Sequence, residues 1–186
     1  MIEVKAPMKF TPSDKFSIYL AGSTGLGLEM GALDWQLEIC KALEESDVLV
    51  LNPRRGDDWG GWIPMSVENE EYRDQVEWEI EAMEFADMIV LNLLPETLSP
   101  IPMLELGLYV KSQKLAVCCP KSYIRRAYVE ILCSHYHIAM SSTFENLLYF
   151  IKECVKYTMP PSRLCRRKAN IDIPFHPPMK KKEDLR

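Results

Sequence analysis

The chain has 186 residues, of which 47% are hydrophobic, so it is long enough for one domain with a substantial core. Its net charge of −5 is unevenly divided: residues 160–186 carry eight Lys/Arg and three Asp/Glu, and the rest carries fourteen basic and twenty-four acidic side chains. An acidic body argues against nucleic acid as the main partner. No stretch has the length of a membrane span and no signal-peptide core is present, so we expect a cytoplasmic protein without a membrane partner. Nuclear targeting through the basic tail is the alternative.

The cysteine pattern predicts reduced thiols. The six cysteines form no CxxC pair and no Cys/His ligand spacing, which argues against a zinc site and against structural disulfides. Nothing in the sequence indicates a metal or a redox cofactor, and we expect none.

Apolar, β-rich runs alternate with segments of helical periodicity along the chain. Strands are predicted at residues 16–22, 47–53, 87–93, 114–120 and, more weakly, 137–140. Helices are predicted at residues 32–46, 67–86, 99–110, 126–136 and 142–157, with Ser66 as the N-cap of the second.

This alternation predicts an α/β fold with a doubly wound, five-stranded parallel sheet, a flavodoxin-like or Rossmann-like three-layer sandwich. Residues 1–14 are interpreted as an N-terminal extension, residues 15–158 as the domain, and residues 159–186 as a basic, proline-containing tail without helical period. Doubly wound sheets bind ligands at the carboxyl ends of their strands. The loops after Gly22, Pro53 and Leu94 are therefore expected at one site.

Glu105 is the only charged residue of the apolar helix predicted at residues 99–110. A glutamate in the first turns of a helix is favoured by the helix dipole, which is one explanation. A partly buried carboxylate kept for chemistry is the other.

A second acid, Glu79, lies on the side of its helix that we expect to be buried. At 100° per residue the stripe is defined by Tyr72, Val76, Ile80 and Met83, and Glu79 falls inside it. A buried carboxylate must be paired, for instance with Arg54 or Arg55, or face a polar cavity. Two carboxylates at one strand-end site suit chemistry at an anomeric carbon, where one remains ionised and the other holds a proton.

Several motifs in order resemble the nucleoside 2-deoxyribosyltransferase-like family. They are "IYLAGS", "DWQ", "NPRR..DW", "QVEWE...MEFADMIVLNLLPETLSPIPMLELGLY" and "KLAVCCP". The resemblance covers roughly residues 16–136. The glutamate of an "ELG" helix after the third predicted strand, with an acid one helix earlier, is the most specific of these features.

The resemblance implies three catalytic residues. Glu105 takes the place of the nucleophile that attacks the sugar C1′ and forms a glycosyl-enzyme. Tyr19 takes the place of the tyrosine that hydrogen-bonds the nucleophile; an ordinary strand aromatic is the alternative. Glu79 stands where relatives usually carry an aspartate associated with the leaving base.

The resemblance also implies substrate-binding residues. Ser99 stands where deoxyribosyltransferases carry an aspartate for the sugar hydroxyl, and where relatives that hydrolyse deoxynucleoside 5′-monophosphates use a serine for phosphate. Gly22, Ser23 and Thr24 begin a glycine-rich loop that cradles phosphate in those relatives, with a flexible turn as the alternative. These features favour hydrolysis over base exchange, and leave both nucleosides and nucleotides as candidate substrates.

The loop after the second predicted strand supplies further candidates for contact with the base. They are Asn52, Arg54, Asp58 and Trp59, the last by stacking, although a packed loop tryptophan is equally consistent with the sequence. Arg125 and Arg126 are interpreted as a solvated surface pair, with a phosphate contact as the alternative.

The sequence therefore predicts an enzyme that cleaves or transfers the N-glycosidic bond of nucleosides or their 5′-monophosphates. A non-catalytic nucleotide sensor and an enzyme that cleaves the nicotinamide–ribose bond of a dinucleotide are the alternatives. Because relatives complete their sites with a neighbouring subunit, the resemblance also implies a homo-oligomer.

Overall fold

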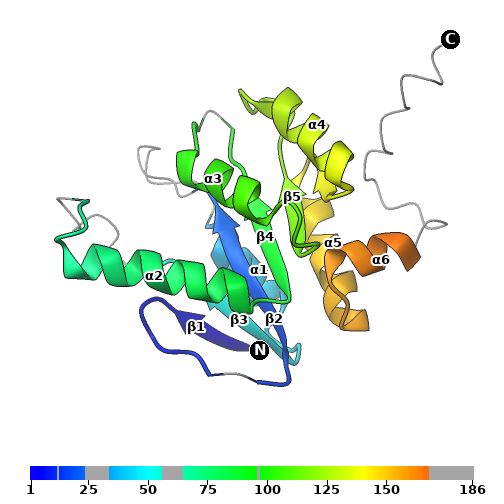
Figure 1. The fold of residues 1–186 in the computed structure, drawn as a ribbon. Coiled ribbons are helices and arrows are strands. Elements are labelled where there is room, and N and C mark those ends of the chain that lie inside the picture. The colour runs from blue at the N-terminus through cyan, green and yellow to red at the C-terminus, as the bar shows by residue number, and fades with distance from the viewer. Residues whose placement is uncertain (12, 24–33, 56–64, 96, 168–186) are drawn as a thin grey trace, which may run out of the picture. The chain divides into compact units, whose positions relative to one another are not determined.

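A computed structural model describes residues 1–11, 13–23, 34–55, 65–95 and 97–167 of the chain. It has an α/β fold of the predicted three-layer, flavodoxin-like or Rossmann-like type, with an all-parallel sheet in the strand order β1-β3-β2-β4-β5-β6 (Figure 1). The sheet has six strands where five were predicted. The additional strand is β1, Ile2–Lys5, in the segment interpreted as an extension. It was missed because a four-residue edge strand gives little periodicity, and its pairing with a neighbouring strand cannot be read from its own sequence.

The residues form two compact units, residues 1–21 with 25–90 and residues 22–24 with 91–186. In the first unit, β3 (Val48–Asn52) pairs in parallel with β1 on one side and with β2 (Phe16–Gly22) on the other. Both β2 and β3 are buried almost throughout, as expected for strands covered on both faces.

Asp87, directly before β4 (Met88–Asn92), fastens the start of that strand to the start of β2. Its carboxylate accepts hydrogen bonds from the backbone N–H and the hydroxyl of Ser17, at 2.9 and 2.8 Å. Its own N–H donates to the Ser17 carbonyl at 3.0 Å. The aspartate of the "FAD" motif is thus a structural residue.

The helices of the first unit are α1 (Trp35–Ala42) and α2 (Glu70–Phe85). Asp34 caps α1, since its carboxylate accepts from the Leu37 N–H at 3.1 Å. The N-cap of α2 is Asn69, which accepts from Tyr72 N at 3.2 Å, so the prediction of Ser66 was wrong. Ser66 instead hydrogen-bonds Glu68 in the turn before the helix.

The buried stripe of α2 also differs from the prediction. It consists of Gln75, Trp78, Ala82 and Met83, while Ile80 is 46% exposed. On a helical wheel its centre lies roughly 80–100° from the predicted one, because the large Trp78 ring turns inward. Glu79 remains at the edge of this stripe and is half-buried.

Among the described residues, the second unit contains the ends of β2 and β4, two further strands and four helices. These elements are α3 (Pro100–Tyr109), β5 (Leu115–Cys118), α4 (Arg126–Tyr136), β6 (Ala139–Ser141), α5 (Phe144–Tyr157) and α6 (Pro161–Arg167). Strands β5 and β6 pair in parallel, and α5 and α6 both pack against them. Helix α5 buries Leu147, Phe150, Ile151 and Cys154 along one face.

Residues 159–186 were expected to lack helical structure, but Pro161–Arg167 form α6. Proline at the first helical position is favourable because its missing N–H has no partner there. Leu164 is fully buried and anchors α6 to the unit. Among the described residues, no helix is long and apolar enough to cross a membrane.

Candidate functional site

A cluster of hydroxyl groups lies at the ends of β2 and β4 in the second unit. The Ser23 and Ser99 oxygens are 2.5 Å apart, and Thr97 Oγ1 lies 2.6 Å from Ser99 Oγ and 3.2 Å from Ser23 Oγ. The backbone of Leu94 fixes the donor or acceptor role of two of these hydroxyls. Ser23 Oγ accepts a hydrogen bond from the Leu94 N–H at 3.0 Å, and Thr97 Oγ1 donates one to the Leu94 carbonyl at 2.9 Å. The Ser23 and Ser99 hydroxyls therefore supply the protons for the remaining hydrogen bonds of the cluster.

Ser99 has an unusual backbone conformation. It is the N-cap of α3 and adopts the left-handed region, with φ 45° and ψ 55°, and it makes no side-chain capping bond. This conformation costs a non-glycine residue about 1–2 kcal/mol, and such strain often marks functional sites. The hydroxyl that would ordinarily cap the helix points instead into the cluster with Ser23 and Thr97.

Helix α3 begins Pro100-Ile101-Pro102, so two of its first three residues have no backbone N–H. Because backbone N–H groups are what make a helix start an anion site, this one offers less than usual. Recognition of an anion here would depend on the hydroxyl cluster.

Gly22, predicted to contact the substrate, has a strict backbone requirement. Its φ is +145°, and a Cβ at this position would lie 2.8 Å from the Asn92 nitrogen and closer still to the Asn92 carbonyl oxygen. The same approach allows Ser23 N to donate to the Asn92 carbonyl at 2.8 Å. Glycine is thus required to bring Ser23 beside β4.

Glu105 is 6% exposed and lies, with Pro102 and Leu106, among the buried residues of α3. Ile101, Leu104 and Leu108 are 53%, 59% and 65% exposed. A charged side chain of α3 is thus buried while three large apolar side chains of the same helix are exposed. Glu105 is the sixth residue of α3, beyond the first turn in which the helix dipole acts strongly, so the dipole does not explain its place.

Tyr123, which the sequence analysis did not single out, supports the hydroxyl cluster. It is buried, and its phenol donates to the Leu98 carbonyl at 3.1 Å, directly before Ser99. Burial raises the pKa of Tyr123, while a hydrogen bond with Ser99 and the charge of Arg125 act in the opposite direction. Arg126 donates instead to the Cys119 carbonyl and to Ser142 Oγ, which is a structural task.

In the first unit, Glu79 ends a chain of hydrogen bonds. Gln75 Nε2 donates to Glu79 Oε1 at 2.7 Å and to the Pro53 carbonyl at 2.9 Å, and Arg55 Nε donates to Gln75 Oε1 at 2.8 Å. Because a guanidinium only donates, Arg55 fixes the orientation of the Gln75 amide. Burial raises the pKa of Glu79, and the Gln75 hydrogen bond and the Arg55 charge partly offset that rise.

Gln75 therefore donates to Glu79 Oε1 whether the carboxyl is charged or neutral. Since Oε1 is occupied as an acceptor, a proton on Glu79 resides on Oε2. Helical spacing brings Gln75 beside Glu79, four residues further along α2. The other two hydrogen bonds of Gln75 depend on Pro53 and Arg55, which the helical period does not predict.

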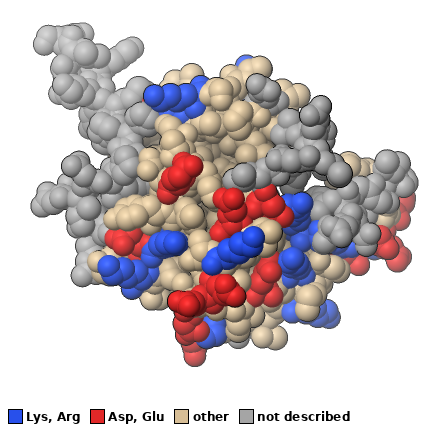
Figure 2. All heavy atoms as spheres, turned by 180° about the vertical axis from the view of Figure 1, so that it is seen from behind, with Lys and Arg blue, Asp and Glu red and all other residues tan. Residues whose placement is uncertain are grey.

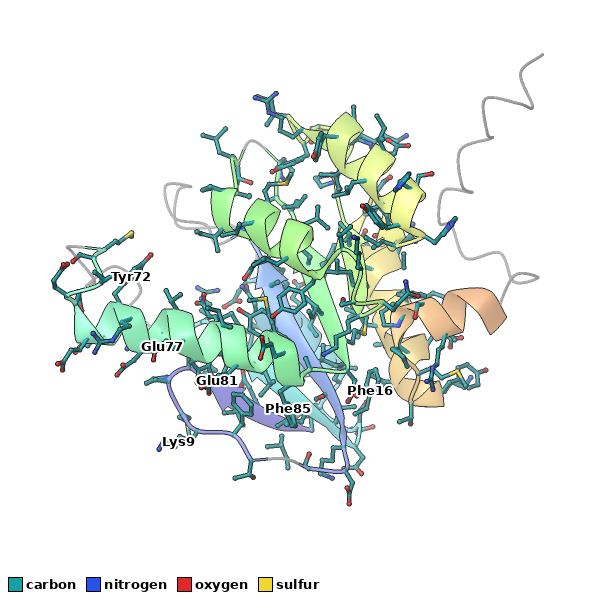
Figure 3. All side chains as sticks on the ribbon, viewed as in Figure 1. Lys9, Phe16, Tyr72, Glu77, Glu81 and Phe85 are labelled. Atoms are coloured by element: carbon teal, nitrogen blue, oxygen red, sulfur yellow. The ribbon has the colours of Figure 1, made fainter. Side chains whose placement is uncertain are left out.

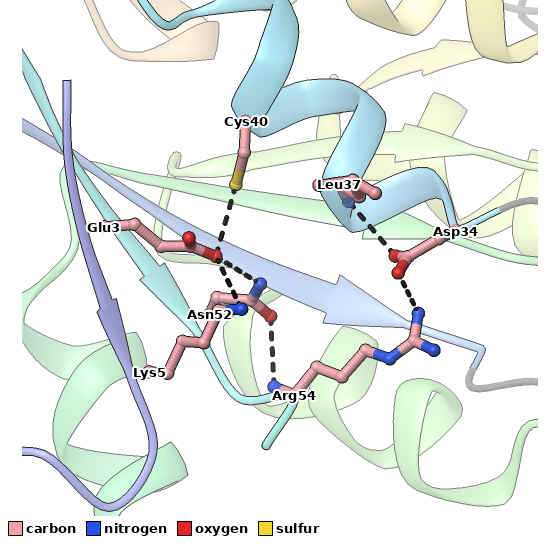
Figure 4. Close-up of polar contacts among 7 residues, drawn as sticks. All are labelled: Glu3, Lys5, Asp34, Leu37, Cys40, Asn52 and Arg54. Atoms are coloured by element: carbon pink, nitrogen blue, oxygen red, sulfur yellow. Dashed lines mark hydrogen bonds and ion pairs between the residues drawn. The ribbon is translucent and has the colours of Figure 1, made fainter. Parts of the chain in front are cut away.

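Asn52 and Arg54, predicted to contact the base, are held by neighbours in the first unit (Figure 4). Asn52 Nδ2 donates to Glu3 Oε1 at 2.8 Å, and its oxygen accepts from Arg54 N at 3.0 Å. The Arg54 guanidinium pairs with Asp34 at 2.6 Å. These contacts order the start of the loop; contact with a substrate stays a prediction for both residues.

Tyr19 is 1% exposed in β2, and its ring centroid lies 6.5 Å from that of Trp78. Its hydrogen bond to Glu105, and the meeting of Glu105 with Glu79, stay predictions. Thr24, Asp58 and Trp59 lie outside the described residues.

Among the described residues, no group of three or more His, Cys, Asp or Glu side chains is arranged to hold a metal ion. On the face drawn in Figure 2, lysines and arginines lie among aspartates and glutamates, without a continuous basic area in its described part.

The chain matches the family model described as "Nucleoside 2-deoxyribosyltransferase like" over residues 15–123, more than half of its length. The matched range includes Tyr19, Ser23, Glu79, Ser99 and Glu105. No curated protein matches the chain. The match lies on the segments that carry the hydroxyl cluster and both acids, and the chain belongs to the nucleoside 2-deoxyribosyltransferase-like family.

Proposed function

We propose that this protein cleaves the N-glycosidic bond of nucleoside 5′-monophosphates, with Glu105 as the nucleophile. Family membership supports a glycosyl-transferring type of enzyme. The observation that carries the proposal is the burial of Glu105 on a helix that exposes Ile101, Leu104 and Leu108, because buried carboxylates are concentrated at functional sites.

The reaction is a double displacement. A Glu105 carboxylate oxygen attacks C1′ and forms an ester bond, while the bond between C1′ and the base nitrogen breaks and its electron pair leaves with the base. Glu79 delivers the proton on Oε2 to the base. A water molecule then attacks C1′ and gives a proton to Glu79, and Glu105 leaves as the carboxylate.

The raised pKa of Glu79 supports its role as the acid, since a carboxyl that keeps its proton nearer to neutral pH is the better donor. The hydroxyl cluster supports a phosphate at the 5′ position. A phosphate oxygen can accept a proton from Ser23 or Ser99 in exchange for a contact within the cluster, and the positive charge of Arg125 acts on the neighbouring Tyr123.

The test is release of free base, followed by chromatography. Deoxynucleoside and ribonucleoside monophosphates, the nucleosides and NAD are each supplied with and without an acceptor base. We expect base from a monophosphate with wild type and with Glu77→Gln, a matched control on the exposed side of α2. We expect none with Glu105→Ala and a reduced rate with Glu79→Gln.

Undiminished release by Glu105→Ala would contradict the nucleophile. Binding of a nucleotide without release of base by wild type would make the protein a sensor, and release of nicotinamide alone would make it a dinucleotide glycohydrolase. Transfer to the acceptor base in place of hydrolysis would overturn the hydrolytic assignment and retain the nucleophile.

We also propose a homo-oligomer that uses the exposed face of α3. Ile101, Leu104 and Leu108 form an uncharged apolar strip, which suits contact between two copies of an acidic chain. Sedimentation of Leu104→Asp should give a smaller species than wild type, whereas Leu37→Asp on α1 should not. Equal masses for all three proteins would contradict this interface.

A further inference from the structure

Residues 1–10, here called the N-terminal arm, lie before the segment that matches the family model. The arm contributes β1, which pairs with β3 from Ile2 opposite Leu49 to Lys5 opposite Asn52. Beyond the strand, Ala6 N donates to the Asn52 carbonyl at 3.1 Å. The arm is thus fixed along the whole of β3, up to the residue at which the candidate base-binding loop begins.

The arm then passes along α2 (Figure 3). The indole N–H of Trp78 donates to the Met8 carbonyl at 2.8 Å. The Phe10 ring packs edge-on against Trp78 and tilted against Phe85, with centroids 5.7 and 5.3 Å apart. One hydrogen bond and two ring contacts therefore hold this side of α2.

Trp78 is the point at which the arm approaches the candidate catalytic residues. Glu79 follows it in the chain, and the Tyr19 ring packs against it. Trp78 is buried, so a change in its position shifts the helix turn that carries Glu79.

The arm's other attachment acts on the hydrogen-bond partner of Glu79. Glu3 and Ala6 hold Asn52, and the next residue, Pro53, supplies the carbonyl that Gln75 contacts together with Glu79. Gln75, a residue of α2, thus links this helix to the end of β3, and the arm contacts both elements.

We propose that the N-terminal arm is a positioning element for Glu79, with Phe10 and Trp78 as its positioning residues. By joining the end of β3 to α2 it sets the distance across which Gln75 reaches the Pro53 carbonyl, and with it the orientation of the amide that donates to Glu79 within α2. The role of Glu79 in the reaction rests on the proposed function; the geometric coupling of the arm to Glu79 does not.

The experiment compares Phe10→Ala, Phe10→Leu and Trp78→Phe in the full chain. Trp78→Phe keeps a ring and removes the donor to Met8, and Phe10→Leu restores apolar volume. Trp35→Phe is the control, because Trp35 is a buried tryptophan of α1 in the same unit. Circular dichroism and thermal unfolding verify that each variant is folded.

Two readouts are taken. In the glycosidase assay, we expect kcat to fall about tenfold in Phe10→Ala and Trp78→Phe with KM within about twofold, since a small misplacement of a catalytic group slows the chemical step. Phe10→Leu should recover most of the rate. In carbon-13 NMR, with the Glu79 carboxyl assigned by its absence in Glu79→Gln, its pKa should move toward the ordinary 4.5 in Phe10→Ala.

A Glu79 titration unchanged in Phe10→Ala and Trp78→Phe, with kcat no lower than in Trp35→Phe, would overturn the proposal. If wild type releases no base, the proposed function fails by itself, and the NMR titration alone then decides whether the arm sets the surroundings of Glu79.

Discussion

The hydroxyls of Ser23 and Ser99 lie 2.5 Å apart although 76 positions separate them in the chain. One follows β2 and the other begins α3, and Gly22 and the left-handed backbone of Ser99 are what allow the approach. Hydroxyl groups so close together suit an acceptor with several oxygens, and this supports the phosphate contact that we propose.

Ser99→Ala should therefore weaken binding of a nucleoside monophosphate more than binding of the nucleoside. A hydrogen bond to a charged group contributes about 1.5–3 kcal/mol, which corresponds to roughly a 10- to 150-fold rise in KM. Steady-state kinetics on the matched pair of substrates measure the difference. Ser122→Ala, at an exposed serine of the same unit, is the control, and an equal rise in KM for both substrates would contradict a phosphate site.

Gly22→Ala should destabilise the fold severely, by about 3 kcal/mol or more, since it adds backbone strain to a steric clash with Asn92. Gly107→Ala provides the contrast. That glycine is exposed in α3 with nothing within 4 Å of a Cβ, so alanine should stabilise the helix by roughly 0.8–1 kcal/mol. Urea unfolding of both variants gives the two free energies, and a stable Gly22→Ala would show that the backbone can relax there.

The order of the elements was predictable because it depends on local periodicity. The sequence run at residues 16–22 became β2 without change, and the helix predicted at residues 126–136 is α4. The stripe of α2 was not predictable in the same way. Trp78 turns inward to meet the Met8 carbonyl and the Phe10 ring, and these contacts come from a distant part of the chain.

For the candidate site, too, features that depend on neighbouring residues were predictable from the sequence, and contacts between distant segments were not. Burial of Glu105 in an apolar helix could be anticipated from its neighbours in the sequence. The support of Ser99 by Tyr123 could not, because it crosses from the loop after β5 to the residue before α3. Likewise, a wheel places Gln75 beside Glu79 but gives no reason for Arg55 to fix its amide.

The buried thiols should be unreactive in the folded protein. Burial raises the pKa of Cys118 to about 11 and that of Cys119 and Cys133 to about 12, from an ordinary 9.0. Their thiolate fractions at pH 8 are then lower by about 100- to 1,000-fold, and the thiolate is the form that reacts. Alkylation with mass mapping should label these three cysteines only after unfolding in urea, and rapid labelling of the native protein would contradict their burial.

The free energy of unfolding should depend on pH through the titration of Glu79. Because its folded pKa lies above the ordinary 4.5, the folded state holds this proton more tightly than the unfolded chain does. The resulting stabilisation is present in full below the unfolded pKa and is lost as pH rises through the folded pKa. Glu79→Gln removes the titrating group and keeps an acceptor for Gln75. The free energy of unfolding of this variant, relative to that of wild type, should therefore be higher at pH 8 than at pH 4. Urea unfolding across this pH range measures the difference, with Glu77→Gln as the exposed control. If the free energy of unfolding of Glu79→Gln relative to wild type instead rose toward acidic pH, the folded state would favour the charged carboxylate.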